Sequence, residues 1–175
     1  MYLKLYRHTK KILMIKINVF VIEKKWSKYI LSSKDFFYKK TELLDNYISY
    51  LRKKNFSFSL RLAGNYEIKN LNRKFRKKNK TTDVLSFPFY RDKELKKKIK
   101  TEKNIYLGDV IINFYKVNKK NNEKDFKKEF NKLWIHGFLH LLGHKHYTNK
   151  DFNKMSKVEK KIFNKIHKNN VKIFW

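Results

Sequence analysis

The chain has 175 residues, which is enough for one domain that buries most of its apolar surface. It contains no cysteine, which excludes disulfides and cysteine-based structural zinc sites, and lysines interrupt its apolar runs, which excludes a membrane span. Its net charge of +30 suits a polyanionic partner such as RNA. A strongly AT-biased genome would produce a similar excess of lysine and asparagine, so the charge alone does not identify the partner.

The N-terminal half of the chain alternates between strand and helix patterns. We interpret residues 1–13 as an N-terminal extension of a single domain that spans residues 14–175. Lysines in this region break any signal-peptide core, so we expect a cytoplasmic protein. Residues 15–22 alternate and are rich in branched side chains, which predicts a strand, whereas residues 35–52 place apolar side chains at helical spacing. Residues 56–62 alternate cleanly and predict a second strand.

A second helix and a third strand are predicted next. Asn65 is expected to cap a short helix. This helix ends in a basic cluster at residues 73–78, which by composition alone is typical of a solvated helix end. After a polar loop, residues 83–87 predict a strand that Pro88 closes.

The following segment is interpreted as a loop and a buried strand. Residues 91–103 are highly charged and are predicted to form a mobile loop, in which Lys96, Lys97 and Lys98 are available for non-specific phosphate contact. Residues 105–112 form a nearly continuous apolar strand. Gly108 within it suggests close approach of the backbone, in our interpretation to the histidine-bearing helix. Asp109 needs a partner there, and two roles stay open: orienting a ligand histidine or bonding nearby backbone.

Two helices are predicted in the C-terminal part. One apolar stripe on the first of them indicates burial against the sheet; it comprises Phe126, Phe130, Leu133, Trp134 and Leu141. A last helix repeats the pattern, and residues 171–175 are expected to form an edge strand or a packed tail. The order of elements predicts an α+β single domain, with a mixed β-sheet of about four strands packed against helices, one of which carries the histidines.

Four of the six histidines lie close together, at positions 136, 140, 144 and 146. His136 and His140 are four residues apart, so they point from one helix face and can bind one small cation together. Gly143 is expected to end the helix in a left-handed turn that brings His146 back over the metal, whereas a continuing helix would present His144 instead. We therefore predict that His136, His140 and His146 bind one zinc ion per chain. The alternative is a histidine-rich helix end that the helix dipole favours.

The spacing of these histidines also raises a protease hypothesis. The pattern H-x-x-x-H-x-x-G-x-x-H is that of metzincin proteases, but the glutamate that follows their first histidine is here Gly137. The helix would therefore supply metal ligands without the general base of the protease. A metal-dependent protease or amidase is kept as the rival enzyme.

The segment from His136 to His146 resembles the signature of the YbeY family, the single-strand-specific metallo-endoribonucleases of ribosomal RNA maturation. Two further segments agree with that family: residues 71–88, from Leu-Asn through an arginine to Thr-Asp-Val-Leu-Ser-Phe-Pro, and residues 107–112, Leu-Gly-Asp-Val-Ile-Ile. The resemblance extends in element order over about residues 15–166. One departure is Lys145, because the family usually has an aspartate just before the last histidine.

The resemblance implies a zinc-dependent endoribonuclease that matures the 3′ end of small-subunit ribosomal RNA and acts in ribosome quality control. Its implied partners are single-stranded ribosomal RNA and the small ribosomal subunit, with neither DNA nor a membrane. Arg76 falls on the family's arginine position, which implies a catalytic guanidinium that holds a phosphate at the mouth of the active site. The general base is not identified, and either a metal-activated water or the ribose 2′-hydroxyl could attack. A non-catalytic ribosome-assembly factor whose metal only stabilises the fold is the third hypothesis.

Overall fold

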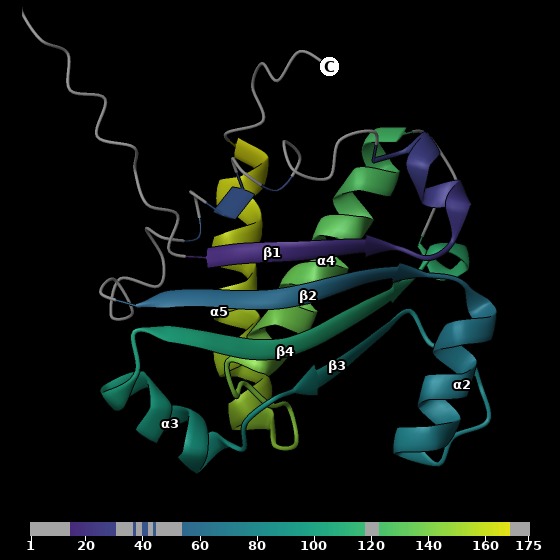
Figure 1. Ribbon diagram of the computed structural model, residues 1–175. Helices are drawn as coiled ribbons and strands as arrows, with labels where there is room; N and C mark the ends of the chain where they lie inside the picture. Colours follow the sequence, from purple (N-terminus) through teal and green to yellow (C-terminus); the bar gives the residue numbers. More distant parts are fainter. Residues whose placement is uncertain are drawn as a thin grey trace, which may run out of the picture.

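A four-stranded mixed sheet forms the centre of the protein (Figure 1). The computed structural model describes residues 15–30, 37, 40, 41, 44, 54–117 and 123–168. The strands are β1 (Ile15–Val21), β2 (Asn55–Ala63), β3 (Val84–Pro88) and β4 (Asn104–Asn113). Their order is β1-β2-β4-β3, with β1, β2 and β4 parallel and β3 antiparallel to β4. This arrangement confirms the predicted mixed sheet and the predicted fold class.

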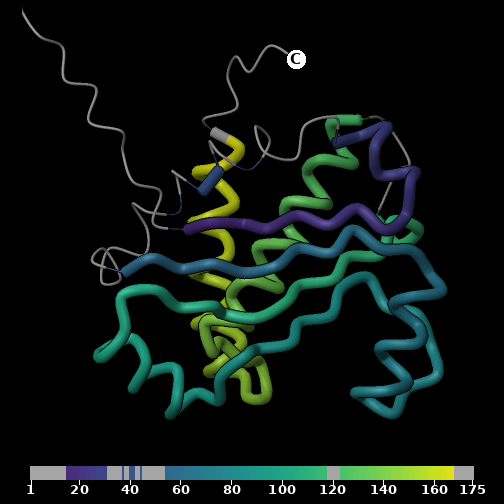
Figure 2. The backbone as a smooth tube through the Cα atoms, in the orientation of Figure 1, coloured from purple at the N-terminus to yellow at the C-terminus, as the bar shows by residue number. Residues whose placement is uncertain are grey.

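The helices pack against the sheet and extend beyond its edges. Helices α4 (Glu123–Leu141) and α5 (Asn149–Lys168) contact each other and cross behind the sheet, as the backbone trace in Figure 2 also shows. Helix α2 (Asn65–Arg76) follows β2 at one end of the sheet, and α3 (Asp92–Thr101) connects β3 to β4. Two short 3₁₀ helices, η1 (Lys24–Lys28) and η3 (Phe114–Lys116), follow β1 and β4.

The two faces of the sheet bury different sets of residues. The alternation predicted for β2 is observed, because Phe58 and Leu60 are fully buried in the main core that includes Trp134 and Phe138 of α4. Ile111 faces the other side, where it packs in a smaller cluster with residues of α2 and β3. Helix α4 is therefore held firmly on one face, and α2 is held on the other.

Residues 91–103 form a helix rather than the predicted mobile loop. Leu95 and Ile99, four residues apart on α3, pack against the main core and so anchor a helix that is otherwise charged. Lys98 forms an i,i+4 ion pair with Glu102, which supports the last turn. The prediction failed because two apolar residues among many lysines gave a weak amphipathic pattern.

Two local expectations are also corrected by the structure. Asn65 does not cap α2: Gly64 is the N-cap residue, and the Asn65 Oδ1 accepts a hydrogen bond of 2.8 Å from Asn113 Nδ2. Gly108 does allow close backbone approach, but to β3 rather than to the histidine-bearing helix. Its φ of +125° favours glycine, and a Cβ atom there would lie 2.1 Å from the Phe87 carbonyl oxygen.

Several predictions fall on other parts of the chain. The N-terminal extension at residues 1–13 and the strand or tail at residues 171–175 lie outside the described residues, as does most of the helix predicted at 35–52. Of that helix, Phe37 and Leu44 are described, and both are buried in the main core. In the described ranges we find no helix with the length and apolarity needed to cross a bilayer.

Candidate metal centre

Helix α4 ends immediately after it has presented two histidines. Gly143 has a φ of +87°, its N–H donates to the His140 carbonyl (3.0 Å), and the His144 N–H donates to the Leu139 carbonyl (3.0 Å). These two bonds form a Schellman motif, the left-handed helix terminator that glycine favours. The helix thus stops where the sequence predicts, and the chain turns back towards His136.

The close packing of α4 on the sheet depends on Gly137. A Cβ atom at this position would lie 2.5 Å from Val110 Cγ1 and 3.2 Å from Ser86 Oγ. Residue 137 therefore faces the sheet, whereas His136 and His140 line the open cavity beside β3. A glutamate at position 137, as in the metzincin pattern, would meet this packed surface, which counts against the protease hypothesis.

Gly137→Ala is accordingly expected to destabilise the protein. The added methyl group overpacks the contact with Val110, which should cost about 1–3 kcal/mol of unfolding free energy. Urea denaturation measures this change, and Val110→Ala in the same chain should recover part of it because it removes the clashing γ-carbons. If Gly137→Ala stabilises the protein, as such a change does in an exposed helix, α4 does not approach the sheet this closely.

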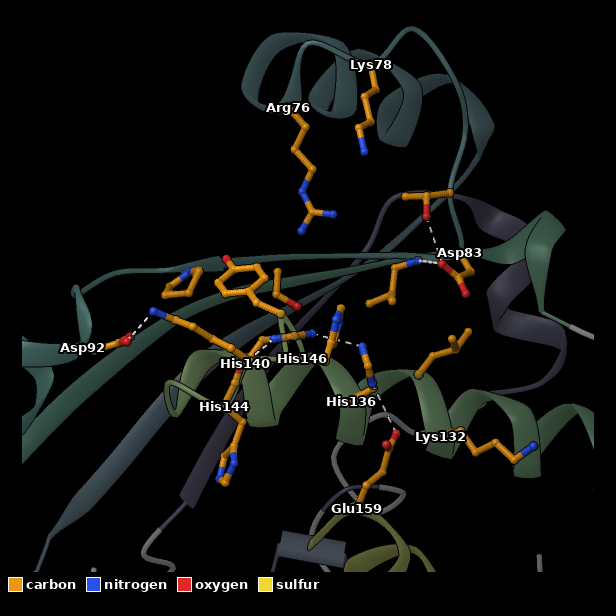
Figure 3. A pocket seen from close by; sticks show the side chains of 17 residues that line it. Arg76, Lys78, Asp83, Asp92, Lys132, His136, His140, His144, His146 and Glu159 are labelled. Carbon is orange, nitrogen blue, oxygen red and sulfur yellow. Dashed lines mark hydrogen bonds and ion pairs between the residues drawn. The ribbon is translucent and has the colours of Figure 1, made fainter. Parts of the chain in front are cut away.

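The structure brings His136, His140 and His146 together, as predicted (Figure 3). One ring nitrogen from each lies within 4.8 Å of the others. The ring centroids are 4.7 Å apart for His136 and His140, 5.0 Å for His140 and His146, and 5.7 Å for His136 and His146. His144 points away from this cluster in Figure 3. The alternative in which α4 continues and presents His144 is therefore wrong.

The hydrogen bonds of the first two rings fit a cation between them. The Nδ1 atom of His140 donates to the His144 carbonyl at 2.8 Å, which leaves its Nε2 unprotonated in the neutral ring. The Nδ1 atom of His136 lies 3.4 Å from Glu159 Oε1, and the carboxylate favours a proton on that atom. Two Nε2 lone pairs then face each other across 3.1 Å. Zinc bound tetrahedrally to both would hold them about 3.3 Å apart.

The electrostatic surroundings keep His140 neutral. Burial lowers the pKa of His140, and the nearby His136, His146 and Arg76 lower it further, against the hydrogen bond to the His144 carbonyl, which raises it. A neutral imidazole is the form that binds metal. The donor set therefore has the number and type of atoms that bind a metal ion, so this cluster could hold one.

Glu159 was not found by sequence reasoning. It lies on α5, where it faces His136 and supplies the carboxylate that commonly supports a metal-binding histidine. Its sequence signal is slight, because it is one of two acidic residues in a lysine-rich helix, eight residues after Asp151. The contact arises because α5 packs against α4. The sequence does not show which residues of the two helices lie opposite each other.

We expect Glu159→Gln to weaken metal binding. The amide keeps the size of the side chain but removes the charge that orients the His136 ring, and loss of such a partner typically costs about 10- to 100-fold in affinity. Competition with a chelator measures the change. Glu129→Gln is a suitable control, because Glu129 pairs with Lys132 on the surface of α4. Equal affinities for wild type and Glu159→Gln would show that the carboxylate has no supporting role.

Lys145, which stands where the family usually has aspartate, pairs with an acidic residue of another helix. Its ammonium forms an ion pair with Asp92, the first residue of α3, and this pair raises the pKa of Lys145. The Asp92 carboxylate also lies beside Gly143, 3.4 Å from where a Cβ atom would be. The ion pair thus ties the segment between α4 and α5 to α3, and it holds the lysine charge at Asp92.

Two cationic side chains at the end of α2 extend towards the histidines. Arg76 and Lys78 both line the cavity that contains the cluster, and both point towards it in Figure 3. Neither side chain has a hydrogen bond or ion pair within the part of the chain that the structure describes. The cavity is open and has a volume of about 700 Å³. Arg76 and Lys78 thus give the cavity positive charge that suits an anionic ligand.

Two buried asparagines fix the segment that carries these cations. Lys77 ends α2 in the left-handed conformation, with φ of 58°. The Asn72 Nδ2 donates to the Lys80 carbonyl (2.7 Å), and Asn113 Nδ2 donates to the Thr82 carbonyl (3.1 Å). Both asparagines are buried, so these bonds are partly shielded from water. The position of Arg76 is therefore set by the fold rather than by a free loop.

Asp109 does not orient a ligand histidine. Its neighbour Val110 contacts α4, and adjacent strand residues point to opposite faces, so Asp109 faces away from the cluster. There it lies beside Tyr106, whose hydroxyl is 2.8 Å from Ser59 Oγ. Burial raises the pKa of Tyr106, and the charge of Asp109 raises it further. Of the two roles considered for Asp109, the one at the metal centre is wrong.

Comparisons with known proteins identify the family and agree with the fold. The family model described as Endoribonuclease YbeY matches residues 21–167. An Endoribonuclease YbeY from Pelagibacter ubique is 43% identical over 152 residues, which cover 86% of this chain and 95% of the relative. Another from Prochlorococcus marinus is 36% identical over 144 residues, covering 81% and 77%. A solution structure of a Thermotoga maritima protein shares the fold, with a TM-score of 0.50 and 24% identity over 88% of this chain and 93% of that one. The chain therefore belongs to the YbeY endoribonuclease family.

Proposed function

We propose that this protein is a zinc-dependent endoribonuclease that cleaves single-stranded RNA, matures the 3′ end of small-subunit ribosomal RNA and acts in ribosome quality control. The proposal includes a cytoplasmic location, the small ribosomal subunit as partner, and one domain at residues 14–175 after an N-terminal extension. One observation carries it above the others: three clustered histidines share an open cavity with Arg76 and Lys78, whose side chains have no partner among the described residues. Membership of the YbeY family supplies the reaction class.

In this proposal His136, His140 and His146 hold the zinc ion. When bound, zinc supplies Lewis acidity, which polarises a phosphate oxygen and lowers the pKa of a coordinated water towards about 7. The Nδ1–H group of His140 stays engaged with the His144 carbonyl, and that of His136 faces Glu159. These contacts orient both rings before the substrate arrives.

Arg76 and Lys78 act on the substrate phosphates. The Arg76 guanidinium can donate two parallel hydrogen bonds to the phosphate that reacts, and its charge offsets the charge that develops there. Lys78 provides a second positive charge for a neighbouring phosphate. Glu159 is the carboxylate within the cavity that faces a histidine, but its contact with His136 suits it to orientation rather than to proton abstraction.

The rival hypotheses predict different results in one experiment. Purified wild type, His140→Ala and the control His144→Ala are each incubated with single-stranded RNA from the 3′ region of small-subunit ribosomal RNA, with its duplex, and with an unstructured polypeptide. We expect wild type and His144→Ala to cut only the single strand, and His140→Ala to be inactive with an unchanged circular dichroism spectrum. Cleavage of the polypeptide would favour the protease. Zinc binding without cleavage of either substrate would favour the assembly factor.

A further inference from the structure

Tyr147 is an exposed aromatic side chain on the wall of the histidine cavity. It follows His146 directly in the sequence, and it lines the same cavity as Arg76 and Lys78. Its exposed fraction is 84%. Exposing an aromatic ring to water forgoes the free energy that burial would provide, so its position needs a cause in local packing or in ligand binding.

Packing at the start of α5 does not explain Tyr147. Thr148 caps this helix, because its Oγ1 accepts a hydrogen bond from the Asp151 N–H (3.1 Å). An apolar residue just before such a cap usually packs against the side chain five residues later, which here is Phe152. Phe152 is itself 58% exposed, and we find no ring contact between the two aromatics in the described chain. The ring of Tyr147 is therefore available to a ligand.

The backbone that carries Tyr147 is anchored on both sides. The Schellman motif at Gly143 fixes the end of α4, and the Thr148 cap fixes the start of α5. Between them, Lys145 is tied to Asp92, and its ammonium nitrogen lies 5.9 Å from the centroid of the Tyr147 ring. A ring on an anchored backbone loses less conformational entropy on binding than one on a free loop.

We propose that Tyr147 forms a stacking subsite for one unpaired nucleobase beside the phosphate that reacts. This inference rests on the proposed function, because it takes single-stranded RNA as the ligand of the cavity. Arg76 and Lys78 contact the phosphates and are indifferent to the bases, whereas an exposed phenol ring stacks on the face of a base. Bases in a duplex are covered by their neighbours on both faces. The subsite thus gives a physical origin for a preference for single strands.

The test is a double-mutant cycle, in which the ring of Tyr147 and one base of the RNA are removed singly and together. Binding of full-length, zinc-loaded protein to a short 2′-O-methyl phosphorothioate RNA is measured, because this RNA resists attack by either nucleophile. In a series of such strands, one abasic nucleotide occupies each position in turn. In wild type, one position should be sensitive to loss of its base. Tyr147→Ala should weaken binding of the complete strand by about 5- to 150-fold, and the sensitive position should disappear.

Three control variants distinguish stacking from other effects. Tyr147→Phe keeps the ring and should bind like wild type. Tyr66→Ala removes an equally exposed tyrosine (84%) that lines a different cavity, and it should also bind like wild type. Tyr147→Ala should keep the salt dependence of binding, whereas Lys78→Gln should reduce its log–log slope by about 0.7.

The subsite and the proposed function can fail separately. If Tyr147→Ala binds as tightly as wild type, or shows the same sensitive position in the abasic scan, Tyr147 is not a stacking residue and the inference is wrong. Cleavage of unmodified RNA by wild type is measured in parallel. If wild type does not cleave but the cycle shows coupling, the nuclease proposal fails while the base-stacking subsite stands.

Discussion

His146→Ala protein is expected to purify without its metal, whereas His144→Ala protein should retain one zinc ion per chain. The reason is geometric: the Schellman turn at Gly143 returns His146 to the cluster and turns His144 away from it. Removal of one of three protein ligands leaves a site with only two, which does not hold zinc against a chelator. Among the expected effects this is the largest on metal content.

Plasma emission spectrometry of the dialysed variants measures this difference directly. His144→Ala is a close control, because the two histidines are two residues apart in the same turn and the substitution is the same. The bond that His140 donates to residue 144 uses a backbone carbonyl, so it survives the loss of the His144 side chain. Metal retained by His146→Ala and lost by His144→Ala would mean that the ligand set is wrong.

The second large effect is expected for Arg76→Lys. Lysine keeps the positive charge but loses the planar fork, so RNA binding should hardly change while the cleavage step slows. Loss of one such donor to a developing charge typically costs roughly 10²- to 10³-fold in rate. Single-turnover cleavage at saturating protein isolates that step from binding.

Arg73→Lys provides the matched control for this substitution. Arg73 lies one turn earlier on α2, is exposed, and does not line the cavity. The Arg73→Lys protein should therefore cleave at the wild-type rate. If Arg76→Lys also cleaves at the wild-type rate under saturation, Arg76 belongs to the general basic surface and contributes no catalytic hydrogen bond.

The parts of the fold that the sequence predicts well are those with strong local signals. Strands β2 and β4 are recognisable from alternating or continuous apolar residues, and the end of α4 from Gly143, whose conformation few other residues adopt readily. The three histidines follow from helical spacing plus this turn. Helix α3 was missed because only Leu95 and Ile99 mark its buried face.

The parts that the sequence does not predict depend on packing between distant elements. Glu159 reaches His136 only because α5 lies against α4, and Lys145 pairs with Asp92 across 53 residues of chain. Two roles stayed open for Asp109, because a nearly continuous apolar strand does not show which of its faces meets the histidine-bearing helix. Arg76 was found through the family resemblance, and its unpaired state is visible only in the structure.

The central claim is that the histidine cluster holds a metal ion on which RNA cleavage depends. The most direct measurement is single-strand RNA cleavage by protein stripped with a chelator and then titrated with zinc, beside His140→Ala treated in the same way. We predict no cleavage without metal, full recovery at one equivalent of zinc, and no recovery for His140→Ala. Cleavage by the stripped wild type at its original rate, or recovery of His140→Ala at one equivalent, would contradict the claim.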